Sequence, residues 1–296
     1  MKILITGKNG QVGWELERIL GPVADVIALD RAQLDLSNEQ QLVETVRGIK
    51  PNIIINAAAY TAVDKAETEI ELAHHVNAMA PKILAEEAKR LNSLLIHYST
   101  DYIFDGAKTT AYTEDDLPNP LNVYGKTKLD GENAIRSVDG NYLILRTSWV
   151  YGARGKNFLL TILRLMKEKK ELRIVADQMG APTWSTTIAR TTKTILEKLD
   201  LAKQENEQKN AKKNGLNTVY HLSSSGQTTW HDFASSIARI TNSDTKVTAI
   251  TTEDYPLPAR RPKNSLLDNS KLFQVFGLKL PYWEEDLAAC IKTMTE

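Results

Sequence analysis

The amino-acid sequence predicts an α/β protein whose core is a doubly wound parallel sheet. Short apolar runs alternate with segments of helical periodicity through about residue 150. The run at 51–59 is almost continuously apolar, as in a strand covered on both faces. The first run leads through a glycine-rich turn directly into a helical pattern. We expect a Rossmann-like domain over residues 1–150. Residues 151–296 should form a smaller, partly interleaved lobe, with some segments returning to the main sheet.

Length and composition limit the class of protein. The chain has 296 residues, enough to bury a core without disulfides or metal ions. Lys plus Arg and Asp plus Glu number 37 each, so no charge excess indicates a nucleic acid or an anionic membrane as partner. The N-terminus lacks a signal-peptide pattern, and no apolar run approaches the ~20 residues that span a bilayer. We expect a cytoplasmic protein in which the one cysteine, Cys290, is buried as a small apolar side chain.

The first predicted strand, at 2–6, is followed by three evenly spaced glycines. Gly7 would allow a tight turn, Gly10 would let the backbone approach a pyrophosphate at a helix N-terminus, and Gly13 would let helix and sheet pack closely. The spacing differs from the Gly-x-Gly-x-x-Gly of the commonest NAD-binding fold. Strand, glycine turn and helix in this order still predict a dinucleotide site rather than an ordinary βα turn.

The second predicted strand, at 25–29, ends at Asp30. A carboxylate at this place binds the adenine ribose 2′-OH in NAD-binding folds. The neighbouring Arg31 could instead bind a 2′-phosphate, so NADH and NADPH both stay open as cofactors.

A helix is predicted from about residue 38 to 48, with Ser37 as its N-cap. Asp35 and Leu36, just before this helix, lie near the expected cofactor edge and could contact adenine. The small residues 57–59 at the end of the third strand leave room for a flat ligand to lie against the backbone.

A possible acid–base pair follows the next predicted strand, at 94–101. Thr100 and Asp101 end that strand, where open α/β sheets bind ligands. Tyr124 and Lys128 share one face of the following helix because they lie four residues apart. An ammonium close to a phenol favours the phenolate, so Tyr124 is a candidate proton donor and acceptor for a carbonyl/alcohol pair. The Tyr-x-x-x-Lys pattern is weak alone, and it gains weight from the motifs that precede it.

Two groups of residues could suggest a metal site. His74 and His75 lie in a helix predicted at about 71–91 and lack partners at metal-ligand spacing, so we expect surface or packed histidines. Glu284, Glu285 and Asp286 could join an interfacial Mg²⁺ site, although a solvated acidic turn is the favoured interpretation.

The second half of the chain predicts helices at 158–170 and 186–201. A strand at 218–222 should return to the main sheet, and Thr229 is a candidate cap for a further helix. The polar stretch 202–215 is interpreted as an exposed helix extension or loop without a site.

Taken in order, the glycine turn, Asp30, the alanine-rich strand end, Ser-Thr-Asp and Tyr-x-x-x-Lys resemble an extended short-chain dehydrogenase/reductase. Longer stretches resemble one family of that class, the dTDP-4-dehydrorhamnose reductases. They are spread along nearly the whole chain, at 5–13 (ITGKNGQVG), 56–67 (NAAAYTAVDKAE), 97–106 (HYSTDYIFDG), 119–128 (NPLNVYGKTK), 146–151 (RTSWVY), 177–183 (DQMGAPT) and 229–232 (TWHD).

The resemblance implies a reaction and a set of roles. The C4 ketone of dTDP-4-dehydro-β-L-rhamnose would be reduced with NADPH or NADH to dTDP-β-L-rhamnose, in the last step of dTDP-L-rhamnose biosynthesis. Tyr124 would donate the proton, Lys128 would hold the nicotinamide ribose and lower the tyrosine pKa, and Thr100 would bind the substrate carbonyl. The resemblance and the motifs together imply cofactor contacts from Gly7, Gly10, Gln11, Val12, Gly13, Asp30, Arg31, Asp35, Leu36, Ala58, Ala59, Tyr60, Thr61, Tyr124 and Lys128.

The resemblance also implies substrate contacts from the C-terminal lobe. Asp101 and Trp149 would meet the sugar, although Trp149 could equally be a core residue. Asn157 and Arg261 are candidates for the diphosphate, because a guanidinium can bind phosphate through two hydrogen bonds. The expected partner is a sugar nucleotide, with neither nucleic acid nor membrane, and the chain would be a monomer or a homodimer, since some relatives dimerise through a divalent ion.

Two other functions stay open at this point. A nucleotide-sugar epimerase would keep NAD bound and would need no added reductant. A dehydratase of this class is disfavoured because Thr100 is followed by Asp-Tyr rather than Asp-Glu. A non-catalytic NADP-binding regulatory subunit, similar to the β subunit of methionine adenosyltransferase, would share the fold and need a large protein partner.

Overall fold

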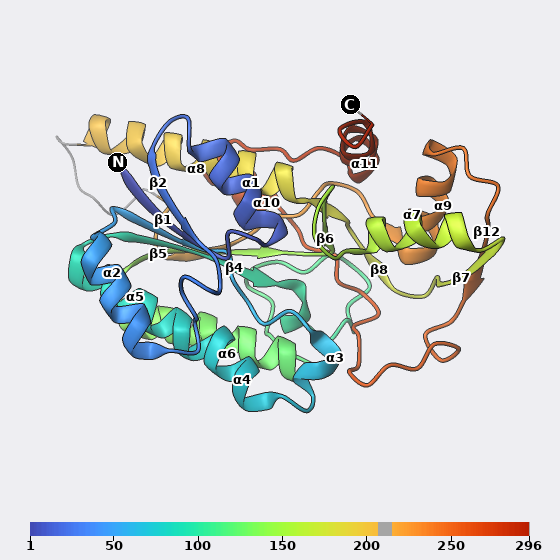
Figure 1. Cartoon of the computed structure of the whole chain (residues 1–296), viewed down its shortest axis with the longest axis horizontal. Coiled ribbons are helices and arrows are strands. Elements are labelled where there is room, and N and C mark those ends of the chain that lie inside the picture. Colours follow the sequence, from blue (N-terminus) through green and yellow to red (C-terminus); the bar gives the residue numbers. More distant parts are fainter. Residues whose placement is uncertain (207–214, 296) are drawn as a thin grey trace.

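The computed structural model describes residues 1–206 and 215–295, and its centre is a six-stranded sheet (Figure 1). All neighbouring strands in this sheet run parallel. From one edge to the other they are β10 (Thr218–His221), β5 (Asn141–Thr147), β4 (Leu94–Thr100), β3 (Ile53–Asn56), β1 (Lys2–Thr6) and β2 (Asp25–Leu29). The chain adds β2 on one side of β1 and then crosses to β3 on the other. The predicted doubly wound fold is confirmed, and ligands bind such sheets where the order reverses.

Helices cover both faces of this sheet (Figure 1). Along β1, Leu4 packs into the core of one face, whereas Ile3 and Ile5 pack into the core of the other. The alternation follows from the twofold side-chain period of a strand. One face is covered by α2 (Glu39–Ile49), α5 (Ala80–Leu91) and α6 (Val123–Val138), and the other by α1 (Gln11–Leu20), α8 (Ser185–Asn206) and α10 (Ser270–Phe276).

The helix predicted at about 71–91 is interrupted. It consists of α4 (Ile70–His74), one π-helical turn (His75–Met79) and α5. Helix α6 packs very closely against this turn, since a Cβ added at Gly131 would lie 2.1 Å from the carbonyl oxygen of Asn77. π-Helical turns are frequent at functional sites, and this one places Asn77 beside the cleft described below.

A smaller lobe contains most of the chain after β5. Its core is formed by aromatic and aliphatic side chains, among them Tyr151, Phe233 and Trp283. It is built from α7 (Phe158–Glu168), α9 (Trp230–Ile240), α11 (Trp283–Lys292), and short strand pairs between β6 (Val150–Tyr151) and β9 (Thr183–Trp184), β7 (Glu171–Val175) and β12 (Lys246–Ile250), and β8 (Met179–Gly180) and β11 (Thr228–Thr229). Strand β10 and helices α8 and α10 belong to the main sheet and its cover, so the C-terminal half is shared. The division at residue 150 stays a prediction.

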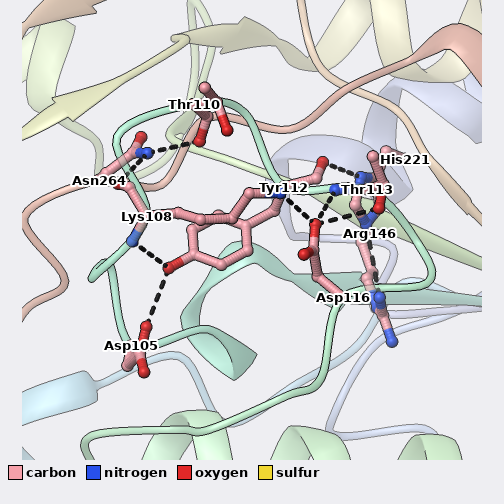
Figure 2. Close-up of polar contacts among 9 residues, drawn as sticks. All are labelled: Asp105, Lys108, Thr110, Tyr112, Thr113, Asp116, Arg146, His221 and Asn264. Atoms are coloured by element: carbon pink, nitrogen blue, oxygen red, sulfur yellow. Dashed lines mark hydrogen bonds and ion pairs between the residues drawn. The ribbon is translucent and has the colours of Figure 1, made fainter.

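The loop between β4 and α6 is held by a polar network (Figure 2). The Tyr112 hydroxyl donates to Asp105 at 2.9 Å, and Asp116 accepts from the main chain and side chain of Thr113. Asn264, distant in sequence, donates its amide hydrogens to two loop carbonyls at 2.8 Å. The loop that connects Asp101 to Tyr124 is therefore fixed against the C-terminal segment.

Three expectations about local structure are settled. Ser37 is not the N-cap of α2: the Asn38 side chain accepts from Gln41 N, while Ser37 donates to Asp35. Thr229 does cap α9, by accepting from Asp232 N. Helix α8 continues to Asn206, and the rest of the polar stretch up to residue 214 lies outside the described residues. Within the described ranges, no helix combines the length and apolar character needed to cross a membrane.

Candidate active site

A cleft of about 500 Å³ lies along the carboxyl edge of the sheet. It is bordered by residues that directly follow β1, β2 and β3 and by the ends of β4 and β5. The residues expected to bind a cofactor lie in its lining, with Gly13 as the exception; they are Gly7, Gly10, Gln11, Val12, Asp30, Arg31, Asp35, Leu36, Ala58, Ala59, Tyr60, Thr61, Tyr124 and Lys128. The fold thus brings together positions spread over most of the first domain. Their individual contacts stay predictions.

The turn after β1 has the backbone that close approach of a ligand requires. Gly7 has a φ of +77°, and a Cβ added there would lie 2.9 Å from the Ala58 backbone. Helix α1 begins at Gln11, so its first N–H groups lie at the cleft and favour an anion. Ser99 Oγ and Thr147 Oγ1 are buried and have no hydrogen-bond partner among the described residues, and both residues line the cleft. Free polar groups and a glycine turn at a helix N-terminus fit a dinucleotide.

Gly13 does not line the cleft; instead, it lets α1 pack closely against the turn after β1. A Cβ at this position would lie 2.1 Å from the carbonyl oxygen of Gly7. We expect Gly13→Ala to lower the unfolding free energy by about 1–3 kcal/mol, because a backbone atom must move, and to weaken cofactor binding. Thermal unfolding and a cofactor fluorescence titration would measure both. Gly48→Ala is the matched control, since a Cβ there meets nothing within 4 Å; equal effects of the two changes would contradict this account.

The carboxylate after β2 is already part of a local network. Asp30 accepts from Asn9 Nδ2 at 3.0 Å and from the main-chain N–H groups of Ala32 and Gln33. Arg31 is largely exposed and lies 3.8 Å from Asp35. A ribose hydroxyl could still donate to Asp30, and Arg31 is free to turn toward a phosphate. Both cofactors therefore stay compatible with this end of the cleft.

Asn77 is a site residue that the sequence interpretation missed. Its side chain accepts from Tyr60 N at 2.8 Å and donates to Tyr60 O and to Thr127 Oγ1 at 3.1 Å. These bonds fix the main chain of Tyr60, which lines the cleft, relative to the helix that carries Tyr124. The sequence did contain a signal for this role, because Asn77 is a polar residue at an interior position of an otherwise apolar helical pattern.

Thr100, Asp101 and Tyr124 meet at the end of β4. Thr100 Oγ1 donates to Asp101 Oδ1 at 2.9 Å and accepts from Tyr102 N. Desolvation in the cleft raises the pKa of Tyr124 to about 12, against the opposing effect of a hydrogen bond with Thr100. A phenol with this pKa keeps its proton at neutral pH, as a proton donor must.

Lys128 lines the cleft, and its amine contacts the end of β4. Its ammonium nitrogen is 2.6 Å from Tyr98 O and 3.1 Å from His97 Nε2. Burial, the carboxylate of Asp101 and the Thr100 hydrogen bond set the pKa of Tyr124, and the net result is a raised pKa. The expected lowering of the tyrosine pKa by Lys128 is therefore not found in this structure, because the amine is directed at β4.

Asp101 gives the site a pH-dependent stability. Burial raises its pKa from 3.8 to about 7. The native state then binds a proton that the unfolded chain has lost, so this contribution is present at low pH and disappears as pH rises to about 7. Between about pH 5 and pH 8, the free energy of unfolding of the wild type should fall by about 3 kcal/mol relative to that of Asp101→Asn. Thermal unfolding across this range measures the difference.

Asp105→Asn is the control for this prediction. Hydrogen bonds, the first from Ala107 N, hold the pKa of Asp105 below its usual range, so its carboxyl stays ionised throughout. A stability difference between wild type and Asp101→Asn that does not change with pH would contradict the prediction.

Trp149 is part of an aromatic stack. Its ring lies 3.5 Å from that of Trp230, nearly parallel, and its Nε1 donates to Ser265 Oγ at 3.0 Å. A Cβ at Gly180 would lie 2.4 Å from the same indole. Packing therefore fixes this tryptophan, and a contact with a sugar stays a prediction for whatever part of the ring remains accessible.

The two residues proposed for a diphosphate are engaged elsewhere. Asn157 caps α7 and donates to Gln11 Oε1 at 2.8 Å, which connects the lobe to the glycine turn. Arg261 forms a two-bond ion pair with Asp64, at 2.6 and 2.8 Å. That pair joins the loop before α10 to α3 (Val63–Ala66). Diphosphate binding by Arg261 would need this ion pair to open, so both roles stay predictions.

The acidic residues near the C-terminus have structural partners. Glu285 accepts from Tyr282 N at 3.3 Å at the start of α11. Asp286 is buried and accepts from Thr187 and Ser224 at 2.8 Å, so it is not the solvated residue that the acidic-turn interpretation assumed. In the described part of the chain, no group of three or more His, Cys, Asp or Glu side chains is arranged to hold a metal ion. His74 and His75 belong to no such group, and Cys290 is buried as expected.

A doubly wound sheet with a glycine turn, a threonine at the end of β4, and Tyr-x-x-x-Lys on the helix that follows defines an extended short-chain dehydrogenase/reductase. Within that class, the chain belongs to the family described as RmlD substrate binding domain, whose model matches residues 1–296.

Individual relatives match over their full length. The dTDP-4-dehydrorhamnose reductase of Burkholderia thailandensis is 45% identical over 302 residues, covering 99% of each chain. The crystal structure of a dTDP-4-dehydrorhamnose reductase from Clostridium acetobutylicum is 40% identical, with a TM-score of 0.90 and full coverage of both chains. The Bacillus anthracis dTDP-4-dehydrorhamnose reductase, solved in complex with NADP, is 34% identical with a TM-score of 0.89 over 99% of each chain.

Proposed function

We propose that this chain reduces the C4 ketone of dTDP-4-dehydro-β-L-rhamnose to dTDP-β-L-rhamnose with NADPH or NADH, as the last step of dTDP-L-rhamnose biosynthesis. The observation that carries the proposal is full-length similarity to reductases of this name, at up to 45% identity. The cleft supports it, because Tyr124 and Lys128 line the space that the glycine turn opens. NADPH as cofactor agrees with the NADP bound in the Bacillus anthracis structure. NADH, which lacks the 2′-phosphate, stays the alternative.

The chain's own residues supply acid and charge stabilisation. A bound nicotinamide supplies the hydride. Tyr124 holds the proton for the developing alkoxide, and its raised pKa keeps it protonated until that oxygen becomes basic. The Thr100 hydroxyl donates to the same oxygen, which stabilises its charge. Lys128 holds the cofactor ribose, and the glycine turn with the start of α1 holds the pyrophosphate.

The smaller lobe takes the sugar nucleotide in this proposal. Asp101 and Trp149 contact the deoxyhexose, and Asn157 and Arg261 contact the diphosphate. Support comes from their positions: Asn157 is bonded to Gln11 of the cofactor turn, and Arg261 contacts the hydroxyl of Tyr102, directly after Asp101. The protein acts in the cytoplasm as a monomer or homodimer.

A coupled assay tests this function. Purified protein would be mixed with NADPH or NADH and with the 4-keto sugar nucleotide, generated in place by upstream enzymes. We expect cofactor absorbance to fall only when the sugar nucleotide is present, with dTDP-rhamnose as product. Tight cofactor binding without turnover would contradict the proposal and favour a regulatory subunit. Protein that purifies with NAD and needs no reductant would favour an epimerase.

A further inference from the structure

A buried chain of hydrogen bonds leads from the end of β1 to Lys128. The Thr6 hydroxyl donates to Asn56 Oδ1 at 2.7 Å, Asn56 Nδ2 lies 3.0 Å from His97 Nδ1, and His97 Nε2 lies 3.1 Å from Lys128 Nζ. Each of the four side chains is at most 2% exposed. They come from three adjacent strands and from α6, so the sheet itself holds them in register.

The chemistry of the donors fixes the orientation of Asn56. Its Oδ1 accepts from Thr6 and also faces Ala58 N at 3.3 Å. A main-chain N–H can only donate, so the atom facing it must be the amide oxygen. The Asn56 NH₂ group therefore faces His97, and because an amide nitrogen can only donate, His97 Nδ1 must accept.

This assignment decides what Lys128 meets. A neutral imidazole carries one proton. With Nδ1 as acceptor, that proton lies on Nε2 and is directed at Lys128 Nζ. An ammonium has three donors and no lone pair, so it would set donor against donor. A neutral amine can accept from Nε2–H and still donate to Tyr98 O, at 2.6 Å.

We infer that Asn56 fixes the His97 tautomer protonated on Nε2, and that this N–H makes His97 a positioning residue that favours the neutral amine of Lys128 over its ammonium form in the free protein. The ring and the amine then form a directed chain, His97 Nε2–H to Lys128 Nζ and Lys128 Nζ–H to Tyr98 O. This arrangement favours the uncharged amine and directs it at β4.

The electrostatic surroundings act in the same direction. Burial lowers the pKa of Lys128 to about 8, against the opposing effect of Glu132. Glu132 is itself paired with Arg146 at 2.7 Å and lies 3.4 Å from Arg136. Burial, the largest cause, lowers the pKa of His97 well below 6.5, so the ring stays neutral; the ammonium form of Lys128 would lower it further.

Among the described residues, two other ionisable groups lie in this part of the cleft, and neither forms an ion pair with Lys128. Tyr124, on the same helix, has its pKa raised to about 12 and is uncharged. Asp101, after β4, has its pKa raised to about 7 by burial, so it is about half ionised at neutral pH, and it accepts a hydrogen bond from Thr100.

The inference concerns the free protein, and only its consequence for catalysis rests on the proposed function. If Lys128 must be charged beside a bound cofactor, then it gains a proton when it leaves His97. Cofactor binding should then take up protons at and above about pH 8, where the amine of the free protein is deprotonated. Calorimetry of NADPH binding in two buffers of different ionisation enthalpy measures this uptake without any turnover.

Two NMR observations on the free protein test the inference directly. In protein labelled with ¹⁵N-histidine, His97 should show an unprotonated Nδ1 and a protonated Nε2; the chain has five histidines, and the His97→Gln spectrum assigns the signal. In protein labelled at lysine Cε, the Lys128 signal should titrate at or below about pH 8, and Lys128→Arg assigns it. An Nδ1-protonated ring, or an ammonium that persists to pH 9 or above, would overturn the inference.

Variants separate this role from a purely structural one. The carboxylate introduced by Asn56→Asp would accept from His97 Nδ1–H, reverse the tautomer and raise the Lys128 titration by at least about one pH unit. His97→Gln should also raise it, because its amide oxygen can accept from an ammonium. Thr6→Val is the matched control, since it removes a hydroxyl from the same chain but leaves the group facing His97 unchanged. If Asn56→Asp and His97→Gln both fold and their Lys128 signal titrates as in the wild type, the positioning role is refuted.

Discussion

Replacing Tyr124 by phenylalanine is expected to lower turnover about 10²–10⁴-fold, the usual size of a lost general acid. Cofactor affinity should be almost unchanged, because the phenyl ring keeps the wall of the cleft. The pKa of about 12 gives the reason: the phenol is protonated at neutral pH, and removing its hydroxyl removes that proton source. Rates of sugar-dependent cofactor oxidation and a separate binding titration would measure both quantities.

The control for this prediction is Tyr220→Phe. Tyr220 is also a buried phenol with a pKa raised to about 12, and its hydroxyl donates to Gly215 O at 2.9 Å, in the core against α10. Removing that hydroxyl tests the general cost of deleting a buried phenol group. Near-normal turnover of Tyr124→Phe would rule out Tyr124 as the proton donor, whereas equal losses in both variants would assign the effect to folding.

The main sheet and most of the cofactor cleft could be predicted because their signals are local. A continuous apolar run such as Ile53–Ile55 is sufficient to indicate a strand covered on both faces. Parallel strands end at one edge, so residues after Thr6, Leu29 and Asn56 had to meet there. The place of the cleft followed from topology without knowledge of any distance, whereas the roles of individual residues came from the family resemblance and stay predictions.

Other features depend on contacts between distant segments, which the sequence pattern does not contain. The stacking of Trp149 on Trp230 and the ion pair of Arg261 with Asp64 each join residues far apart in the chain. The π-helical turn at Asn77 keeps apolar spacing on both sides, so helical periodicity continued through it. The contact of Lys128 with β4 could not be predicted, because helical spacing places the lysine near Tyr124 but does not include the carbonyl of Tyr98.

Replacing Lys128 by methionine should reduce cofactor affinity and turnover together. Loss of a hydrogen bond from a charged donor costs about 1.5–3 kcal/mol, so the cofactor should bind about 10–100-fold more weakly. Turnover should fall about 10²–10³-fold, because charge stabilisation near the reacting oxygen is also lost. The binding titration and oxidation assay used for Tyr124→Phe apply here, and an effect on neither quantity would contradict the proposed position of Lys128.

Thermal unfolding distinguishes this loss from a loss of structure. In Lys128→Met, His97 Nε2 and Tyr98 O lose their partner, at a cost of about 1–3 kcal/mol for an unpaired buried group. The variant also no longer buries an amine, which acts in the opposite direction. The unfolding midpoint should therefore change little while function falls. Lys126→Met, an exposed lysine on the same helix, should change neither, and a functional loss there as large as in Lys128→Met would mean that the buried amine has no special part in binding or turnover.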